Sequence, residues 1–339
     1  MFAVSSFFGY NTTFVSTPVA TAATGVGETS FTANWNAFAG ASYYLLDVST
    51  SSSFSSFVGS YQNFVVITNS QVVSGLTANT TYYYRLRAAT GVDADAASFF
   101  SRVYTAGGAL SYTEVSATET LVANLKANSL WTPMKAIYPM VGASAEACKQ
   151  NLKSSSFTGT FTSGWTFAST GVTPNGTSAF MNTGLIPNTS LLLDSIHGSS
   201  YSRTNGVQAG PLFSSENAGT YYNGFYIWPN YSAGTISVRV NDDTSTGGTN
   251  SSTLGLSLIT RTSSTIKKYF RNNVSIVNTT VTSTGLNTSS IYLGASRNNA
   301  NFTSYEQAFA SFGDGLTDTQ AGNLYTAVQA FQTTLSRQV

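Results

Sequence analysis

Short runs of alternating apolar and polar residues dominate the chain, and this is the pattern of half-buried β-strands. Near the start, Phe31–Trp35 alternates in this way. Further on, Thr81–Ala88 places Tyr82, Tyr84 and Leu86 on one face of a predicted strand. Gly, Ser and Asn fill the gaps between these runs, as they do in turns. The pattern predicts an antiparallel β-sandwich in the first third of the chain.

The same alternation returns from residue 150 to residue 312. Asn272 and Asn273 follow one of the runs and precede Val274–Val277, and they predict a tight hairpin turn because Asn tolerates positive φ. Roughly ten strands in the about 190 residues from 150 to the last residue imply two stacked sheets, a jelly roll. The predicted strands are Phe157–Phe161, Gly164–Phe167, Leu191–Ile196, Tyr222–Trp228, Thr235–Val240, Leu254–Arg261, Thr265–Phe270, Ser290–Leu293 and Gln307–Phe312.

Two segments have a helical spacing instead. Apolar residues recur at three- to four-residue steps after Thr118, which predicts a helix over about 118–130 with Thr118 as its N-cap. A longer stripe follows Thr317, with Gln320 at the third helical position, and predicts a helix over about 318–336. The predicted fold class is therefore all-β, with a helical linker between two β domains and a C-terminal helix.

Composition then narrows the classes of function. Charged residues make up 9% of the chain and hydrophobic residues 42%, which excludes disorder driven by charge. With a formal net charge of +1 and no basic cluster, nucleic-acid binding is not expected. No run reaches the roughly 18 apolar residues of a membrane helix. Cys148 and His197 are each the only residue of their type, which excludes an intrachain disulfide and any site that needs several histidines.

Trp35 ends the predicted strand Phe31–Trp35, and it is followed by Leu76 and then by Tyr82 at a predicted corner. In these positions the first segment resembles a fibronectin type III domain. The resemblance implies that the Tyr82 hydroxyl bonds to a nearby backbone group and fixes the corner. Ala78-Asn79 stands where that family often has Pro-Gly, and Asn preserves the turn because it tolerates the left-handed conformation.

The later stretches Gly164–Thr166, Thr173–Thr177 and Thr260–Asn273 carry a second resemblance, to the concanavalin-like (laminin-G-like) jelly rolls. With Ile137–Gly142 and Ala308–Asp318 added, the segment is similar to structural proteins of phages that infect Bacteroidota, in which such a domain follows a fibronectin-like one. This resemblance implies a component of a virion.

Together these patterns divide the chain into an N-terminal arm (residues 1–15), a fibronectin-like sandwich (16–107) and a concanavalin-like jelly roll (108–339). Within the arm, the apolar stretch Phe2–Phe8 predicts either a docking arm for another virion protein or an edge strand.

The carboxylates show no arrangement for catalysis. A glycosidase needs two carboxyl groups about 5 to 9.5 Å apart across a cleft, and Glu306 has no second acid two or four positions away. We therefore predict that the protein is not an enzyme and needs no cofactor. The main metal candidate is Ca²⁺ at Asp242 and Asp243, which follow a predicted strand, although a solvated turn is the favoured interpretation of that pair. Asp93 and Asp95 form a weaker pair of the same kind.

The densest aromatic stretch, Tyr221–Tyr231, is the candidate for glycan contact, because sugars stack on exposed rings while amides bond to their hydroxyl groups. The alternative is a buried strand whose alternate rings form core. Trp228, Asn230 and Tyr231 lie near the end of the strand and are the predicted contacts. Nearby, Arg239 either orders a ligand or caps a loop.

The sequence therefore predicts a structural protein of a phage virion, in the capsid or the tail. The predicted protein forms a homo-oligomer, binds other virion proteins and contacts host-surface polysaccharide. The alternative is a secreted, extracellular carbohydrate-binding module or an accessory protein of a glycoside hydrolase. Neither hypothesis involves nucleic acid or insertion into a membrane.

Overall fold

The computed structural model describes residues 17–216, 222–232, 234–296 and 301–339. The chain forms two compact units, one that ends at Thr105 and adds Ala109–Ala123, and a second that contains Ala106–Gly108 and Asn124–Val339. The predicted boundary after residue 107 remains a prediction. The N-terminal arm, with its stretch Phe2–Phe8, lies outside the described residues. In the described ranges, no helix is long and apolar enough to cross a membrane.

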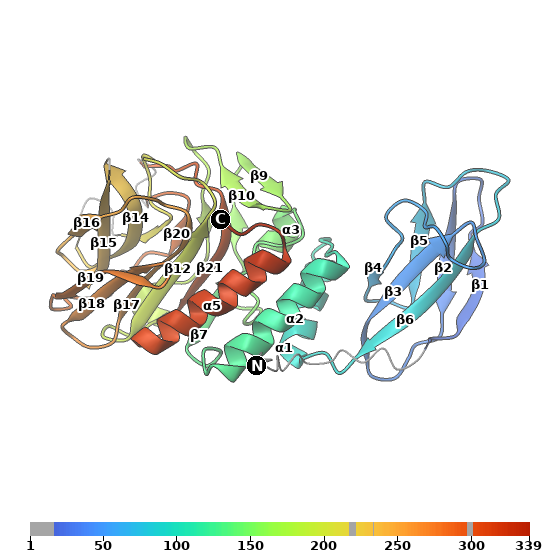
Figure 1. Cartoon of the computed structure of the whole chain (residues 1–339), viewed down its shortest axis with the longest axis horizontal. Coiled ribbons are helices and arrows are strands. Elements are labelled where there is room, and N and C mark those ends of the chain that lie inside the picture. Colours follow the sequence, from blue (N-terminus) through green and yellow to red (C-terminus); the bar gives the residue numbers. More distant parts are fainter. Residues whose placement is uncertain (1–16, 217–221, 233, 297–300) are drawn as a thin grey trace, which may run out of the picture. The chain divides into compact units, whose positions relative to one another are not determined.

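The first unit contains two three-stranded antiparallel sheets, with the orders β1-β2-β5 and β4-β3-β6 (Figure 1). Phe31 and Leu86 belong to the hydrophobic core of this unit. Because β1 and β6 each pair with one neighbour in the described residues, both are edge strands. The six strands are β1 (Ala20–Thr24), β2 (Ser30–Trp35), β3 (Ala41–Ser49), β4 (Phe64–Val66), β5 (Ser70–Ser74) and β6 (Tyr83–Thr90).

The three residues that carry the fibronectin resemblance lie in this core region. Trp35 and Leu76 are buried, and the backbone N–H of Thr77 donates to the Tyr82 hydroxyl at 2.8 Å. Asn79 has a φ of 56°, the left-handed conformation that the turn before Tyr82 needs. This is the geometry that the corner role requires, and membership of the fibronectin family itself remains a prediction.

Two helices follow the first sandwich, and the sequence predicted only one of them, with the wrong start. Helix α1 (Ala94–Thr105) begins where Asp93 Oδ1 accepts the N–H of Asp95, so Asp93 caps a helix rather than ligating a cation. Helix α2 (Tyr112–Ala127) begins after Ser111, which shares a reciprocal capping box with Glu114. The predicted cap, Thr118, lies buried inside α2 and donates to the Glu114 carbonyl.

The second unit consists of two packed sheets, as the jelly-roll prediction requires, and the all-β fold class is confirmed. The eight-stranded sheet contains β7 (Met134–Tyr138), β9 (Trp165–Ala168), β10 (Gly171–Pro174), β12 (Ile196–Ser202), β17 (Gly255–Arg261), β18 (Ile266–Arg271), β19 (Val274–Thr280) and β21 (Gln307–Gly313). The seven-stranded sheet contains β8 (Thr160–Phe161), β11 (Met181–Asn182), β13 (Phe213–Ser215), β14 (Gly224–Ser232), β15 (Thr235–Asp242), β16 (Thr246–Thr249) and β20 (Tyr292–Leu293). Two short helices, α3 (Ala145–Cys148) and α4 (Pro187–Ser190), lie in connections.

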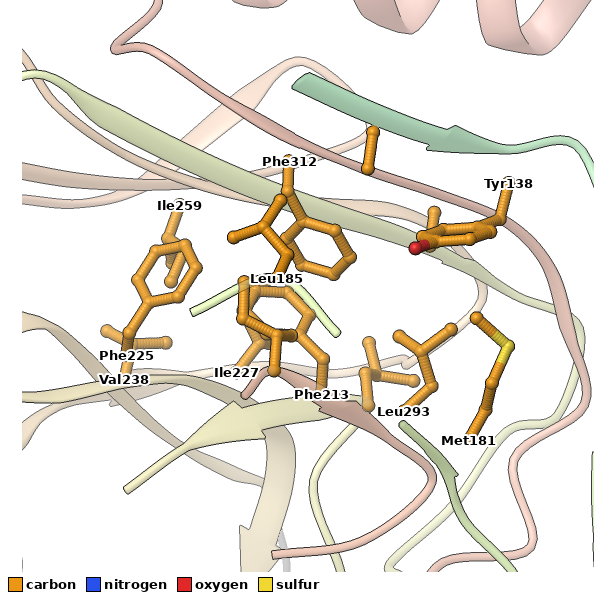
Figure 2. Packing of buried hydrophobic residues seen from close by; sticks show 14 of the residues in the cluster. Tyr138, Met181, Leu185, Phe213, Phe225, Ile227, Val238, Ile259, Leu293 and Phe312 are labelled. Atoms are coloured by element: carbon orange, nitrogen blue, oxygen red, sulfur yellow. The ribbon is translucent and has the colours of Figure 1, made fainter. Parts of the chain in front are cut away.

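Aromatic and aliphatic side chains fill the space between the two sheets. Figure 2 shows Phe312 of one sheet above Phe213 and Phe225 of the other. The ring centroids of Phe213 and Phe312 lie 5.0 Å apart in an edge-to-face contact, and those of Phe213 and Phe225 lie 5.3 Å apart. Such contacts add to the free energy gained by burying the rings.

The predicted strand Leu191–Ile196 is wrong, and the packing around the observed strand, β12, explains why. The sequence predicted Leu191–Ile196, whereas β12 begins at Ile196 and continues through residues that are mostly small and polar. A Cβ on Gly198 would lie 2.5 Å from the Phe213 ring, so the core requires glycine there. By contrast, the predicted turn at Asn272 and Asn273 is confirmed, with φ of 47° and 64°.

Strand β21 lies inside its sheet although it comes late in the sequence. It pairs with β12 and β10, and β7 pairs with it as well. Helix α5 (Asp318–Thr334) follows and packs on this sheet, where Gln332 Nε2 donates to the Ala308 carbonyl at 3.2 Å (Figure 1). The predicted capping box of Thr317 and Gln320 is confirmed.

Candidate functional site

An open cleft lies on the outer face of the seven-stranded sheet. Along β14, Phe225 and Ile227 point into the core, so the alternation places Tyr226 and Trp228 on the opposite face. The cleft has a volume of about 790 Å³, within the usual range for ligand sites. Its described lining consists of Gln208, Ala209, Glu216, Tyr226, Trp228, Tyr231, Ser232, Ser237, Arg239, Ser245 and Asn301.

Two aromatic rings form one wall of the cleft. Trp228 and Tyr231 meet edge to face, with ring centroids 4.8 Å apart. The Trp228 indole N–H donates to the Gln208 carbonyl at 3.1 Å, which fixes the orientation of the ring. Tyr231 is 57% exposed and Trp228 is partly exposed. The wall therefore presents apolar surface of fixed orientation to solvent.

The charged groups of the described lining are Arg239 and Glu216. The Arg239 guanidinium lies 5.9 Å from the centroid of the Tyr226 ring, a cation–π arrangement. A Cβ on Gly224 would lie 2.8 Å from Cδ of Arg239, so the glycine leaves room for the arginine stem. Burial raises the pKa of Glu216, and the nearby Arg239 partly offsets that rise. The cleft thus holds a cation beside a carboxyl group whose charged form is disfavoured.

Hydroxyl groups line the floor between these features. The Tyr226 hydroxyl lies 3.1 Å from Ser237 Oγ, which in turn lies 2.7 Å from Ser245 Oγ. Hydroxyl groups both donate and accept, so this chain of three can adapt to either polarity in a ligand.

Of the three residues predicted for glycan contact, the structure brings two together. Trp228 and Tyr231 line the cleft, whereas Asn230 does not. Asn230 is buried, and its Oδ1 accepts the N–H of Gly234 within the turn between β14 and β15. The Asn230 Oδ1 atom is thus used by the turn, and glycan contact by Asn230 stays a prediction.

The two residues of the metal prediction, Asp242 and Asp243, have different hydrogen-bond partners. Asp242 is buried, and its two carboxylate oxygens accept from Arg261 Nη2 and Lys267 Nζ, both at 3.0 Å. Asp243 instead accepts the N–H of Asn223 at 2.7 Å. The described residues contain no group of three or more His, Cys, Asp or Glu side chains that could hold a metal, and Ca²⁺ binding by this pair stays a prediction.

Other residues singled out in the sequence lie away from the cleft. Glu306 forms a two-pronged ion pair with Arg203, with N–O distances of 3.0 and 2.9 Å. His197 is buried, and its Nδ1 donates to the Asp314 carbonyl at 2.6 Å. Cys148 is also buried. The ion pair of Glu306 and the burial of His197 and Cys148 indicate structural roles for these side chains.

Sequence reasoning missed the contributions of Gln208, Glu216 and Tyr226 to the cleft. The alternation of β14 was a usable signal for Tyr226, because it shares a face with Trp228. Gln208 and Glu216 come from segments before and after β13, and no local pattern in the sequence connects them to β14.

No protein-family model matches the chain, and no curated protein matches its sequence. Several solved structures are similar. Domain 4 of AbnA, an extracellular GH43 arabinanase from Geobacillus stearothermophilus, in complex with arabinotriose, is 14% identical, and the match covers 57% of this chain and 98% of that chain with a TM-score of 0.42. Trypanosoma rangeli sialidase in complex with sialic acid is 8% identical over 75% of this chain and 42% of the sialidase, with a TM-score of 0.43.

A third similar structure is the CBM40 of Ruminococcus gnavus IT-sialidase bound to α2,6-sialyllactose, which is 13% identical over 40% of this chain and 84% of that chain, with a TM-score of 0.32. At such identities and TM-scores these likenesses concern the outline of the fold, and they carry no argument about the ligand of this chain.

Proposed function

We propose that this protein binds carbohydrate through the cleft on the outer face of its seven-stranded sheet. The observation that carries the proposal is the pair of partly exposed rings, Trp228 and Tyr231, beside polar side chains in one concavity. A sugar ring has an apolar face and a rim of hydroxyl groups. It therefore needs an apolar surface and hydrogen-bonding groups at the same place, which is what the cleft offers.

Each part of the lining has a role in this proposal. The Trp228 ring is held in position by its bond to Gln208, so stacking a sugar on it orders little of the protein. The hydroxyl groups of Ser237 and Ser245 and the guanidinium of Arg239 are placed to bond to sugar hydroxyl or carboxyl groups. Preorganised rings and adaptable polar groups together are typical of ligand-binding sites.

Binding, rather than hydrolysis, is the function that this geometry supports best. Glu216 is the one carboxyl group of the described lining. Most glycosidases instead use two carboxyl groups that flank the scissile bond. We accordingly extend the prediction of a non-enzymatic protein to this cleft, as a proposal.

The test is titration of the full chain with a panel of neutral and acidic oligosaccharides, for the parent protein and the variant Trp228→Ala. We expect the variant to bind roughly 30-fold more weakly, because losing a central aromatic contact costs about 2 kcal/mol. Tyr222→Ala is the matched control, since Tyr222 is 61% exposed but does not line the cleft. Equal affinities for Trp228→Ala and the parent protein, or no binding to any sugar of the panel, would contradict the proposal.

The setting in which the cleft works is a separate question. The virion component and the secreted module remain two predictions, and of the similar structures named above none is a virion protein. A secreted module would bind carbohydrate as its main function, whereas a virion component would bind it during attachment to the host. Mass spectrometry of purified virions and of culture supernatant separates them, because a virion component is enriched in the particles and a secreted module in the supernatant.

A further inference from the structure

The pairing of two strands fixes how four side chains of the cleft are arranged. Strands β14 and β15 are neighbours in the seven-stranded sheet (Figure 1). Tyr226 pairs with Arg239 and Trp228 pairs with Ser237, and the register between these two pairs is regular. All four side chains line the cleft, so they form a rectangle on one face of the sheet. Trp228 and Arg239 occupy one diagonal of this rectangle, a separation of about 7–8 Å.

The neighbours of Arg239 hold its guanidinium in the cleft. The guanidinium lies 5.9 Å from the centroid of the Tyr226 ring, and the Tyr226 hydroxyl lies 3.1 Å from Ser237 Oγ, which keeps that ring in place. Arg239 is half-buried, so water screens its charge only in part. A guanidinium in this setting presents a planar fork of N–H donors, which matches the two oxygens of a carboxylate.

The balance of charge in the described lining favours an anion. The lining contains one cation, Arg239, and one carboxyl group, that of Glu216. Glu216 is 8% exposed, and its burial raises the pKa of the carboxyl group, so its charged form is disfavoured. A ligand that enters the cleft therefore meets the cation more directly than the carboxyl group.

We infer that the cleft selects sugars that carry a carboxylate, and that Arg239 binds this carboxylate. The inference rests on the proposed function of the same cleft and names the class of sugar. A sugar ring stacked on Trp228 places its substituents over the neighbouring positions of the sheet, and a carboxylate on the ring meets the guanidinium across the diagonal. A neutral sugar can stack in the same way but lacks the charge-assisted bonds, which are roughly twice as strong as bonds between neutral groups.

Calorimetric titration of the full chain with two matched pairs of sugars tests the inference. One pair is a galacturonate trisaccharide and the galactose trisaccharide of the same linkage, and the other is sialyllactose and lactose. At neutral pH we expect the acidic sugar of at least one pair to bind roughly tenfold or more tightly than its neutral partner. A preference in one pair alone identifies the source of the carboxylate and supports the inference. Equal affinities within both pairs, or tighter binding of the neutral sugars, would overturn it and leave the proposed carbohydrate binding intact, whereas no binding of any sugar would overturn both.

Arginine variants then test the residue itself. Arg239→Gln should weaken binding of the acidic sugar by roughly tenfold or more and that of the neutral sugar much less, and Arg239→Lys, which keeps the charge but loses the fork, should fall in between. Trp228→Ala should weaken both sugars, because both stack on the ring. The matched control is Arg271→Gln, which removes the same charge from β18 of the other sheet, outside the lining of the cleft. An equal loss for both sugars in Arg239→Gln, or the same loss in Arg271→Gln, would overturn the role of Arg239.

Discussion

The second unit contains two groups of charged residues that meet on strand β15. They differ in their burial and in the face of the sheet on which they lie. Arg239 points outward into the open cleft, while Asp242, three positions on, points inward and pairs with Arg261 and Lys267 of the opposite sheet. In the inner cluster both cations are fully buried, and backbone carbonyls such as that of Val240 satisfy the remaining donors. The buried ion pairs indicate a structural role for the inner cluster, whereas Arg239 lies in the cleft for which we propose a ligand.

Removing the inner anion is the strongest way to break this comparison. Asp242→Asn would leave two buried cations without their carboxylate, and we expect the free energy of unfolding to fall by about 3–5 kcal/mol. Denaturant unfolding at neutral pH measures the loss. The control is Asp243→Asn at the exposed neighbouring position, which should cost less than about 1 kcal/mol. Equal midpoints for the two variants would show that the cluster has no structural role.

The next largest effect concerns the dependence of stability on pH, which has opposite signs for His197 in the interior and Glu216 in the cleft. Burial lowers the pKa of His197 to about 4, so the folded state binds fewer protons than the unfolded state below the ordinary pKa of 6.5. The contribution of His197 is therefore present above pH 6.5 and is lost as pH falls toward 4, by roughly 3 kcal/mol. The raised pKa of Glu216 acts in the opposite direction, with a contribution that is lost as pH rises.

Unfolding curves between pH 7 and pH 4 for the parent protein and His197→Gln measure this contribution. The variant should be less stable at pH 7, because glutamine fills the site imperfectly, and its stability should fall less on acidification. Parallel pH profiles for the two proteins would contradict a buried neutral His197.

The smallest predicted effect concerns Asn241, which lies between Arg239 and Asp242 on β15. Asn241 has a φ of 59° and forms a bulge between Val240 and Asp242, where the pairing of β14 with β15 shifts register. Asn241→Ala should cost about 1–2 kcal/mol, because alanine resists the left-handed conformation. Asn241→Gly removes that strain but loses the bond from Nδ2 to the Leu193 carbonyl. If the alanine variant were as stable as the glycine variant, the bulge would not require a left-handed residue.

The bulge also shows where sequence reasoning stopped. Trp228 was singled out because it lies near the end of a predicted strand, and the structure places it on the outer face with Tyr226, as a period of two requires. Past Asn241 the period breaks, and Asp242 turns inward instead of entering a solvated turn. Pattern alone could not reveal this, since the partners of Asp242 lie on strands of the other sheet.

The predictions for strand β12 and helix α1 were wrong for a different reason. Several buried positions of β12 carry Gly or Ser, and at Gly198 the rings of Phe213 and Phe225 leave no room for a side chain. Small residues in a core resemble a loop when only the sequence is read. Helix α1 was missed because Asp93 and Asp95 were interpreted as a turn or a weak cation pair rather than as the start of a helix. Caps were informative where apolar spacing supported them, as at Thr317.

The central position of β21 has a consequence for how the protein is made. Its partners β7, β10 and β12 are synthesised well before it, and the eight-stranded sheet is incomplete until Gln307–Gly313 has left the ribosome. Until then the earlier strands keep exposed edges and an uncovered apolar face, the state in which a nascent chain is most prone to aggregate. The second unit therefore completes its folding late in translation. Until then its unfinished sheet must be shielded from aggregation in the host cell.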